Sequence, residues 1–149
     1  MATELSPDEF AREVLDLGIA AGVFDNSVTP ELITTDGAVT ARKAWSRVYE
    51  PKPEPWWPEV TELGITTTVG LAFQLYKHDA ISEQMDDVVR LSARMLERLT
   101  GDAILTGLDV LWLVRKDGTL DVSENPDIWT PERLAELPQP YRRRTHSYD

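Results

Sequence analysis

A long amphipathic helix pattern near the middle of the chain is the feature that most constrains the fold. Ser82 is a residue type that caps helices, Gly101 is one that ends them, and an apolar face repeats at helical spacing between the two. That face consists of Met85, Val88, Val89, Met95, Leu96 and Leu99. Charged side chains at three- and four-residue spacing, from Glu83 to Glu97, indicate ion pairs exposed to solvent. We therefore expect this helix to pack its apolar face on a sheet.

Strand patterns lie on both sides of this helix. We predict strands over residues 38–49, 65–76, 103–106, 110–115 and 119–122. The second of these is the clearest, because apolar side chains alternate along it from Ile65 to Leu75 and can cover a core on one side. The last three are close together, and Asp117-Gly118 suits a tight hairpin turn between the final two. They should form a meander.

Helix signals also stand near both ends of the chain. Ser6-Pro7-Asp8-Glu9 is typical of a capping box, and the helix that it starts should end near Gly22. Thr29-Pro30-Glu31 predicts a short helical turn, and Thr130-Pro131-Glu132 predicts a last short helix through Leu137.

The order of the main elements is helix, two strands, helix, three strands and a short helix. This order favours an α+β fold with a largely antiparallel sheet of about five strands, covered by two main helices. We expect a single domain over residues 1–149, in which residues 142–149 form a mobile tail.

Composition limits what this chain can bind. Its 149 residues include 26 acidic and 15 basic side chains, for a formal net charge of -11, and no cysteine. Nucleic acid and anionic membranes recruit Lys and Arg, so both are disfavoured as partners. The longest mostly apolar run, residues 103–114, is interrupted by Asp109 and is too short to span a bilayer. Because no export signal opens the sequence, we expect a cytoplasmic protein.

The negative charge is concentrated in three segments. Residues 1–36 carry a net charge of -7, residues 50–62 one of -3 and residues 117–136 one of -5, while three consecutive arginines stand at 142–144. Helix caps and ion pairs explain much of the acid in the first segment. The acid in loops 50–62 and 117–128 lacks such an explanation, and it predicts a surface that faces a basic partner.

The chain is poor in catalytic groups. His78 and His146 belong to a loop and to the tail, where neither looks shielded from solvent. Asp86 and Asp87 are neighbours on a helix and diverge by about 100°, so they do not converge on a substrate. Metal-ligand spacing and a glycine-rich phosphate loop are absent, and the acidic spacing within 121–127 lacks the central glycine of a calcium loop. We therefore expect no enzymatic activity, metal or cofactor.

Two adjacent tryptophans lie in a proline-rich stretch. Trp56 and Trp57 are flanked by prolines and by Glu54 and Glu59. Tryptophan is enriched in interface hot spots, and an aromatic pair ringed by carboxylates suits a basic protein partner. Large aromatic rings also dominate hydrophobic cores, so one or both rings could instead cover the edge of the sheet. The sequence leaves both alternatives open.

Several stretches of the sequence carry a family resemblance. They are Trp45–Val48, Val60–Ile65 after the Pro-Trp-Trp loop, Met85–Arg90, Thr100–Leu105, Leu111–Gly118, and Trp129–Ala135 with Pro140-Tyr141. On these stretches the chain resembles the Sit immunity family, small proteins encoded with polymorphic toxins that mediate contact-dependent inhibition between related bacteria. The resemblance covers about two thirds of the chain, and it departs from the family at Thr106-Gly107-Leu108-Asp109, where relatives often have a more polar turn.

The resemblance implies a protein that binds a cognate toxin and neutralises it, with no catalysis of its own. It also gives the acidic loops a role, since an acidic protein can be steered onto the basic active site of a toxin that attacks nucleic acid. The residues that we expect to face the toxin are Glu54, Trp56, Trp57, Glu59, Asp121, Glu124 and Asp127.

Two other functions are compatible with the sequence. One is a small-molecule binding or sensor module, with a groove between the long helix and the sheet lined by Tyr76, Trp112 or Trp45. The other is a weak hydrolase, which requires two converging buried carboxylates. Homo-oligomerisation is compatible with all three functions.

Overall fold

The strands form two sheets, and not the single sheet expected from the sequence. The computed structural model describes residues 1–148. In chain order the elements are α1 (Pro7–Ala20), α2 (Pro30–Thr34), β1 (Ala38–Val39), β2 (Trp45–Tyr49), α3 (Pro58–Thr61), β3 (Gly70–Gln74), α4 (Ile81–Arg98), β4 (Ala103–Gly107), β5 (Val110–Lys116), β6 (Thr119–Val122), α5 (Pro131–Glu136) and β7 (Arg142–Arg143). The α+β class is confirmed, whereas the single sheet and the expected order of elements are wrong.

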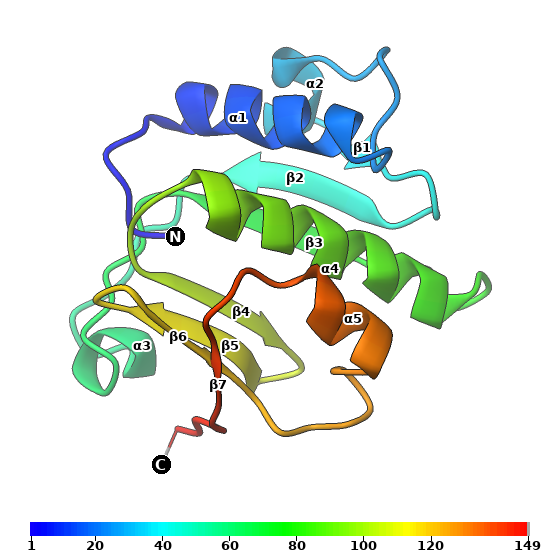
Figure 1. Ribbon diagram of the computed structural model, residues 1–149. Helices are drawn as coiled ribbons and strands as arrows, with labels where there is room; N and C mark the ends of the chain where they lie inside the picture. Colours follow the sequence, from blue (N-terminus) through cyan, green and yellow to red (C-terminus); the bar gives the residue numbers. More distant parts are fainter. Residues whose placement is uncertain (149) are drawn as a thin grey trace.

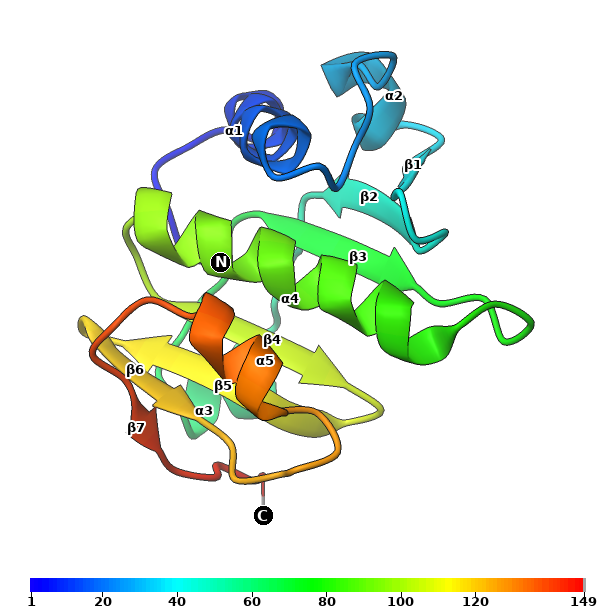
Figure 2. The same cartoon turned by 45° about the vertical axis from the view of Figure 1, so that its right-hand side comes forward.

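The break between the sheets falls between β3 and β4. The first sheet has the order β1-β2-β3, and the second has the order β4-β5-β6-β7. All pairs of neighbouring strands are antiparallel except β6 and β7, which are parallel. Figure 2 shows β3 and β4 running in the same direction, with α4 as the connection between them. Each of these two strands is therefore the edge of its own sheet.

Helix α4 holds the two halves of the molecule together. Figure 1 shows it crossing the middle, between α1, α2 and the first sheet on one side and α5 and the second sheet on the other. Leu91 is buried in one core with Phe10 of α1 and Val48 of β2. Val89 is buried in a second core with Leu113 of β5. Two faces of one helix thus bury apolar surface against two sheets. Within residues 1–148, no helix combines the length and apolar composition needed to cross a membrane.

The strand expected over residues 38–49 is a hairpin. Its arms, β1 and β2, pair with Ala38 opposite Ser46. The Thr40 amide donates to the Ala44 carbonyl oxygen at 2.7 Å, and Lys43 takes a φ of 80°. The turn contains no glycine, asparagine or proline, so the sequence carries no turn signal at this point.

Strand β3 is shorter than the strand expected over residues 65–76. The chain just before it pairs with the N-terminus instead, since the amides of Thr68 and Val69 donate to the Met1 carbonyl oxygen at 2.9 and 3.2 Å. Ile65 is buried against the second sheet. The alternating apolar pattern of residues 65–76 therefore covers both β3 and the segment just before it, which bonds to the N-terminus.

Three of the predicted helix starts are confirmed. The Ser6 side chain accepts from the Glu9 amide at 3.1 Å, and the Glu9 carboxylate accepts from the Ser6 amide at 3.0 Å, which completes the capping box of α1. Thr29 and Thr130 cap α2 and α5 in the same way through their hydroxyl groups. Local sequence decides these starts because each cap satisfies amides within its own first turn.

The sequence does not predict two of the elements. Helix α3 begins at Pro58, inside the region read as an extended loop. Strand β7 lies in residues 142–149, where we expect a tail: Arg142 and Arg143 pair with Asp121 and Val122 of β6. The start of the expected tail thus forms the outer strand of the second sheet.

Candidate partner-binding surface

The Trp loop, residues 51–58, leads into α3 and presents its aromatic rings at the surface. Trp56 is 70% exposed and Trp57 is 37% exposed. The Trp57 carbonyl oxygen accepts from the Thr61 amide at 3.0 Å, and the Trp57 amide donates to the Glu54 carbonyl oxygen at 3.0 Å. Backbone bonds therefore hold this turn in place, and the Trp56 ring lies outside the hydrophobic core.

A groove of about 930 Å³, which we call the interstrand groove, runs between β3 and β4. Its lining includes Leu71 of β3, Leu105 of β4, Trp112 of β5, and Ile81, Met85 and Val88 of α4. Glu59 of α3 and Ile128, the neighbour of Asp127, also line it. One residue from each acidic loop, 50–62 and 117–128, therefore lines the same groove, although the loops are far apart in the sequence.

The negative charge of loop 50–62 acts on a residue at the end of the groove nearest α3. Tyr148 lines the groove there together with Glu59. Burial raises the pKa of the Tyr148 phenol to about 12, and the charges of Glu59 and Glu62 act in the same direction. Glu59 and Glu62 thus contribute negative charge near this end of the groove. Glu54 is exposed on the Trp loop.

Asp121 differs from the other acids expected at the surface. It is buried, and its carboxylate accepts from Arg142 Nε at 2.7 Å and from Arg142 Nη2 at 3.0 Å, while His146 Nε2 lies 2.8 Å away. The hydrogen bonds from Arg142 lower the pKa of Asp121 against the opposing effect of burial. In the free protein this carboxylate is therefore paired within the chain.

The Asp121→Asn variant should unfold at a lower urea concentration than the native chain at pH 7. Because the folded-state pKa of Asp121 lies below the ordinary value of about 3.9, its stabilising effect is present above that value and is lost as the pH falls through the folded-state pKa. Urea denaturation between neutral pH and pH ~2 should therefore show the difference in midpoint closing in acid. A constant difference across this range would mean that the carboxylate charge contributes nothing.

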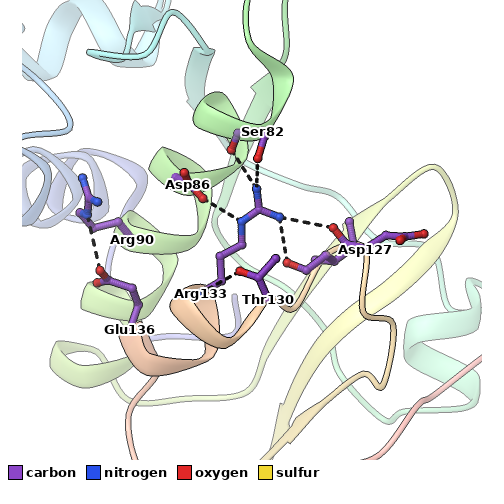
Figure 3. A network of polar contacts seen from close by, with 8 residues as sticks. Ser82, Asp86, Arg90, Asp127, Thr130, Arg133 and Glu136 are labelled. Atoms are coloured by element: carbon purple, nitrogen blue, oxygen red, sulfur yellow. Dashed lines mark hydrogen bonds and ion pairs between the residues drawn. The ribbon is translucent and has the colours of Figure 1, made fainter.

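Arg133 holds the acidic loop 117–128 in place, a role that the sequence did not predict. Its side chain is buried, and the guanidinium donates to Asp86 Oδ1 at 2.8 Å, to the Ser82 carbonyl oxygen at 2.8 Å and to the Ile128 carbonyl oxygen at 2.9 Å (Figure 3). Helix α4 begins at Ile81 with Ala80 as its cap residue, so Ser82 lies inside the first turn, where its hydroxyl accepts from Arg133 at 3.0 Å. The prediction of a cap at Ser82 is wrong.

Glu124 and Asp127 are exposed on this anchored loop. The Glu124 amide donates to the Thr145 hydroxyl at 3.0 Å, and the Asp127 amide donates to Asn125 Oδ1 at 2.9 Å. Arg133 also donates to the Asp127 carbonyl oxygen, at 3.4 Å. The backbone bonds hold the loop, and the two acidic residues remain accessible to a partner.

The groups considered for catalysis have different partners. Asp86 accepts from the buried arginine of α5, and Asp87 accepts from the Arg42 amide at 2.8 Å. Asp87 is only 1% exposed, so its expected place in a solvated ion-pair stripe is wrong. His78 is exposed, and His146 lies against Asp121. In the part of the chain that the structure describes, no group of three or more His, Cys, Asp or Glu side chains could hold a metal ion.

Fold and surface together define an α+β protein in which one helix joins two sheets, with acidic and aromatic residues around the groove between them. The family model described as SitI3-like matches residues 1–133, from the N-terminus into the first turn of α5. The chain therefore belongs to the SitI3-like family, and the resemblance to Sit-type immunity proteins is confirmed. No curated protein and no solved structure matches the chain.

Proposed function

We propose that this protein binds a cognate polymorphic toxin in the cytoplasm and neutralises it by stoichiometric contact, without catalysing a reaction. Membership of the SitI3-like family supports the immunity role. The observation that carries the proposal is the 70% exposed Trp56 ring on an acidic loop that borders the interstrand groove. An exposed tryptophan suits an interface anchor, because its burial in a complex removes a large apolar area from water.

The charge of the surface indicates the kind of toxin. Glu59 lines the groove and is partly exposed, and Glu54, Glu124 and Asp127 are exposed on the two acidic loops. Asp121 is not counted with them, because Arg142 already pairs with it. A basic toxin would be steered toward this surface over a distance of about 10 Å at moderate salt.

Reversing the charge of the second acidic loop tests this surface. The variant Glu124→Lys with Asp127→Lys should associate about tenfold more slowly with the toxin domain encoded by the neighbouring gene, and the loss should fade at high salt. Surface plasmon resonance with an inactive toxin domain, at low and high salt, measures both effects. Co-expression with the active toxin reports rescue of growth.

The matched control is Asp16→Lys with Glu31→Lys, two exposed acids on α1 and α2. Both variants raise the formal net charge from -11 to -7, because each acid-to-lysine change adds two charges. If the control slows association as much as the loop variant does, bulk charge steers the toxin and the surface assignment is wrong. If the native chain neither binds nor rescues, the proposed function itself is wrong.

A small-molecule binding module is the second candidate, and the volume of the interstrand groove favours it. A volume of about 930 Å³ falls in the range of ligand pockets, and Trp112 lines it as expected. Trp45 and Tyr76 are engaged elsewhere: the Trp45 indole donates to the Asp36 carbonyl oxygen at 3.1 Å, and the Tyr76 backbone bonds to Gln84. Native mass spectrometry of protein purified from its own host should show no bound small molecule if the toxin is the partner, and a retained ligand would favour this candidate.

A further inference from the structure

The facing edges of β3 and β4 form the two sides of the interstrand groove. Each strand pairs on one side only, β3 with β2 and β4 with β5. Alternate residues of an edge strand direct their backbone N–H and C=O groups away from the sheet, where they can pair with another strand. Residues of both strands line the same groove, and α4 covers it from one side. Two edges with free pairing capacity therefore face each other.

The N-terminal segment shows how wide the gap between the two edges is. The Met1 amino group donates to the Val69 carbonyl oxygen at 2.7 Å, on the residue that precedes β3. The next residue bonds to the opposite side, because the Ala2 amide donates to the Asp102 carbonyl oxygen at 2.8 Å, on the residue that precedes β4. Consecutive residues bonding in opposite directions are typical of a central strand. At this end, the gap is one strand wide.

The width at the Met1 end suits a strand, and not a helix, as the occupant of the gap. Neighbouring strands lie about 4.8 Å apart, whereas a helix with its side chains is about 10–12 Å across. The groove continues from Met1 along both strands to Leu108 and Asp109 at the end of β4. Each strand has five residues, so an inserted strand of about the same length, roughly 17 Å, would pair with both edges.

The lining of the groove indicates the chemistry of that strand. The wall formed by α4 is apolar, with Ile81, Met85 and Val88. The charged side chains that line the groove in the described part of the chain are Glu59 and Asp109, both acidic. One face of the occupant should therefore be apolar toward α4, while the other carries Lys or Arg toward the acidic rim.

We infer that a basic β-strand of the toxin inserts between β3 and β4 and joins the two sheets into one; this inference rests on the proposed function. Main-chain hydrogen bonds to both edges supply the pairing, as in other cases of strand addition. The exposed Trp56 and the acidic loops then contact the toxin around the inserted strand.

Amide hydrogen exchange measured by NMR tests the insertion. On addition of an inactive form of the toxin domain encoded by the neighbouring gene, alternate amides within residues 70–74 and 103–107 should exchange at least about tenfold more slowly. Protection must appear on both strands, because the inserted strand pairs with both. Binding without new protection on β3 and β4 would overturn the inference and leave the proposed function standing.

A pair of variants at the groove provides an independent readout. Gln74 and Thr106 are exposed residues that line the groove from the two strands. Gln74→Arg with Thr106→Arg should weaken toxin binding about tenfold or more, whereas Gln74→Glu with Thr106→Glu should bind at least as well as the native chain. Equal weakening by both pairs, or by neither, contradicts a basic occupant. A cooperative thermal unfolding transition of each double variant checks that it is folded.

Two further outcomes separate the inference from its alternatives. If the toxin fails to bind the native chain, the proposed function fails and the inserted strand fails with it. If β3 and β4 amides instead gain protection as the concentration of the protein alone is raised, a second copy of this chain occupies the groove. Sedimentation velocity would then detect the dimer, and the toxin-strand inference would be overturned.

Discussion

The Arg133→Met variant is expected to lose about 3 kcal/mol of unfolding free energy. Methionine keeps much of the side-chain volume but donates no hydrogen bond, so the Ser82 and Ile128 carbonyl oxygens lose their guanidinium partner. Asp86 also loses its ion pair, although its side chain is 48% exposed and water can solvate the carboxylate. Most of the expected cost therefore comes from the part-buried hydrogen bonds that the guanidinium donates to these two carbonyl groups. Urea denaturation monitored by tryptophan fluorescence measures it.

The Arg42→Met variant is the matched control for this loss. Arg42 pairs with Glu83 of α4 at 3.5 Å, and the two side chains are 49% and 56% exposed. Exposed pairs contribute little, so this variant should cost no more than about 0.5 kcal/mol. Equal stability losses in the two variants would show that the network around Arg133 is no stronger than an exposed ion pair.

The Gly101→Ala variant is expected to lose about 3 kcal/mol for two reasons that act together. Gly101 has a φ of 116°, a conformation that strains any residue with a Cβ atom. A Cβ atom there would also clash with the Ala2 carbonyl oxygen, so the N-terminal segment would have to move. The amides of Thr68 and Val69, which bond to Met1, should then exchange faster with solvent.

The Gly118→Ala variant separates these two reasons. Gly118 has a φ of 83°, and a Cβ atom there would meet nothing within 4 Å. It should cost only the strain of a positive φ, about 1 kcal/mol, and leave the exchange of Thr68 and Val69 unchanged. If Gly101→Ala behaves like Gly118→Ala in both measurements, the N-terminal segment is not held against Gly101.

Local signals correctly predicted three of the helix starts and the meander of β4, β5 and β6. Ser6, Thr29 and Thr130 cap their helices with bonds inside a single turn, so neighbouring residues decide the outcome. The Asp117-Gly118 turn joins β5 and β6 as expected, with both residues at positive φ. The turn between β1 and β2 carries none of the usual turn residues, and its hairpin was missed for that reason.

The candidate surface was only partly predictable from the sequence. The exposed acids follow from charge without local partners, whereas the sequence left open whether the Trp56 ring is exposed or buried. The pairing of Asp121 with Arg142 joins residues 21 positions apart, and no local pattern in the sequence links them. The role of the seven expected partner-binding residues in toxin recognition stays a prediction.

By itself, the sequence determined the α+β class, three of the helix starts, the meander and the excess of acid, because each depends on residues close together in the chain or on composition. Only the tertiary structure decided that the sheet divides between β3 and β4 and that a groove lies there. The physical reason is that strand pairing is a contact between distant segments. The alternation of side chains shows which face of a strand is buried, but it does not show which strand lies beside it. Met1 and Ala2 occupy one end of the gap through bonds to residues more than 60 positions away. No local sequence pattern at either end of these bonds predicts them.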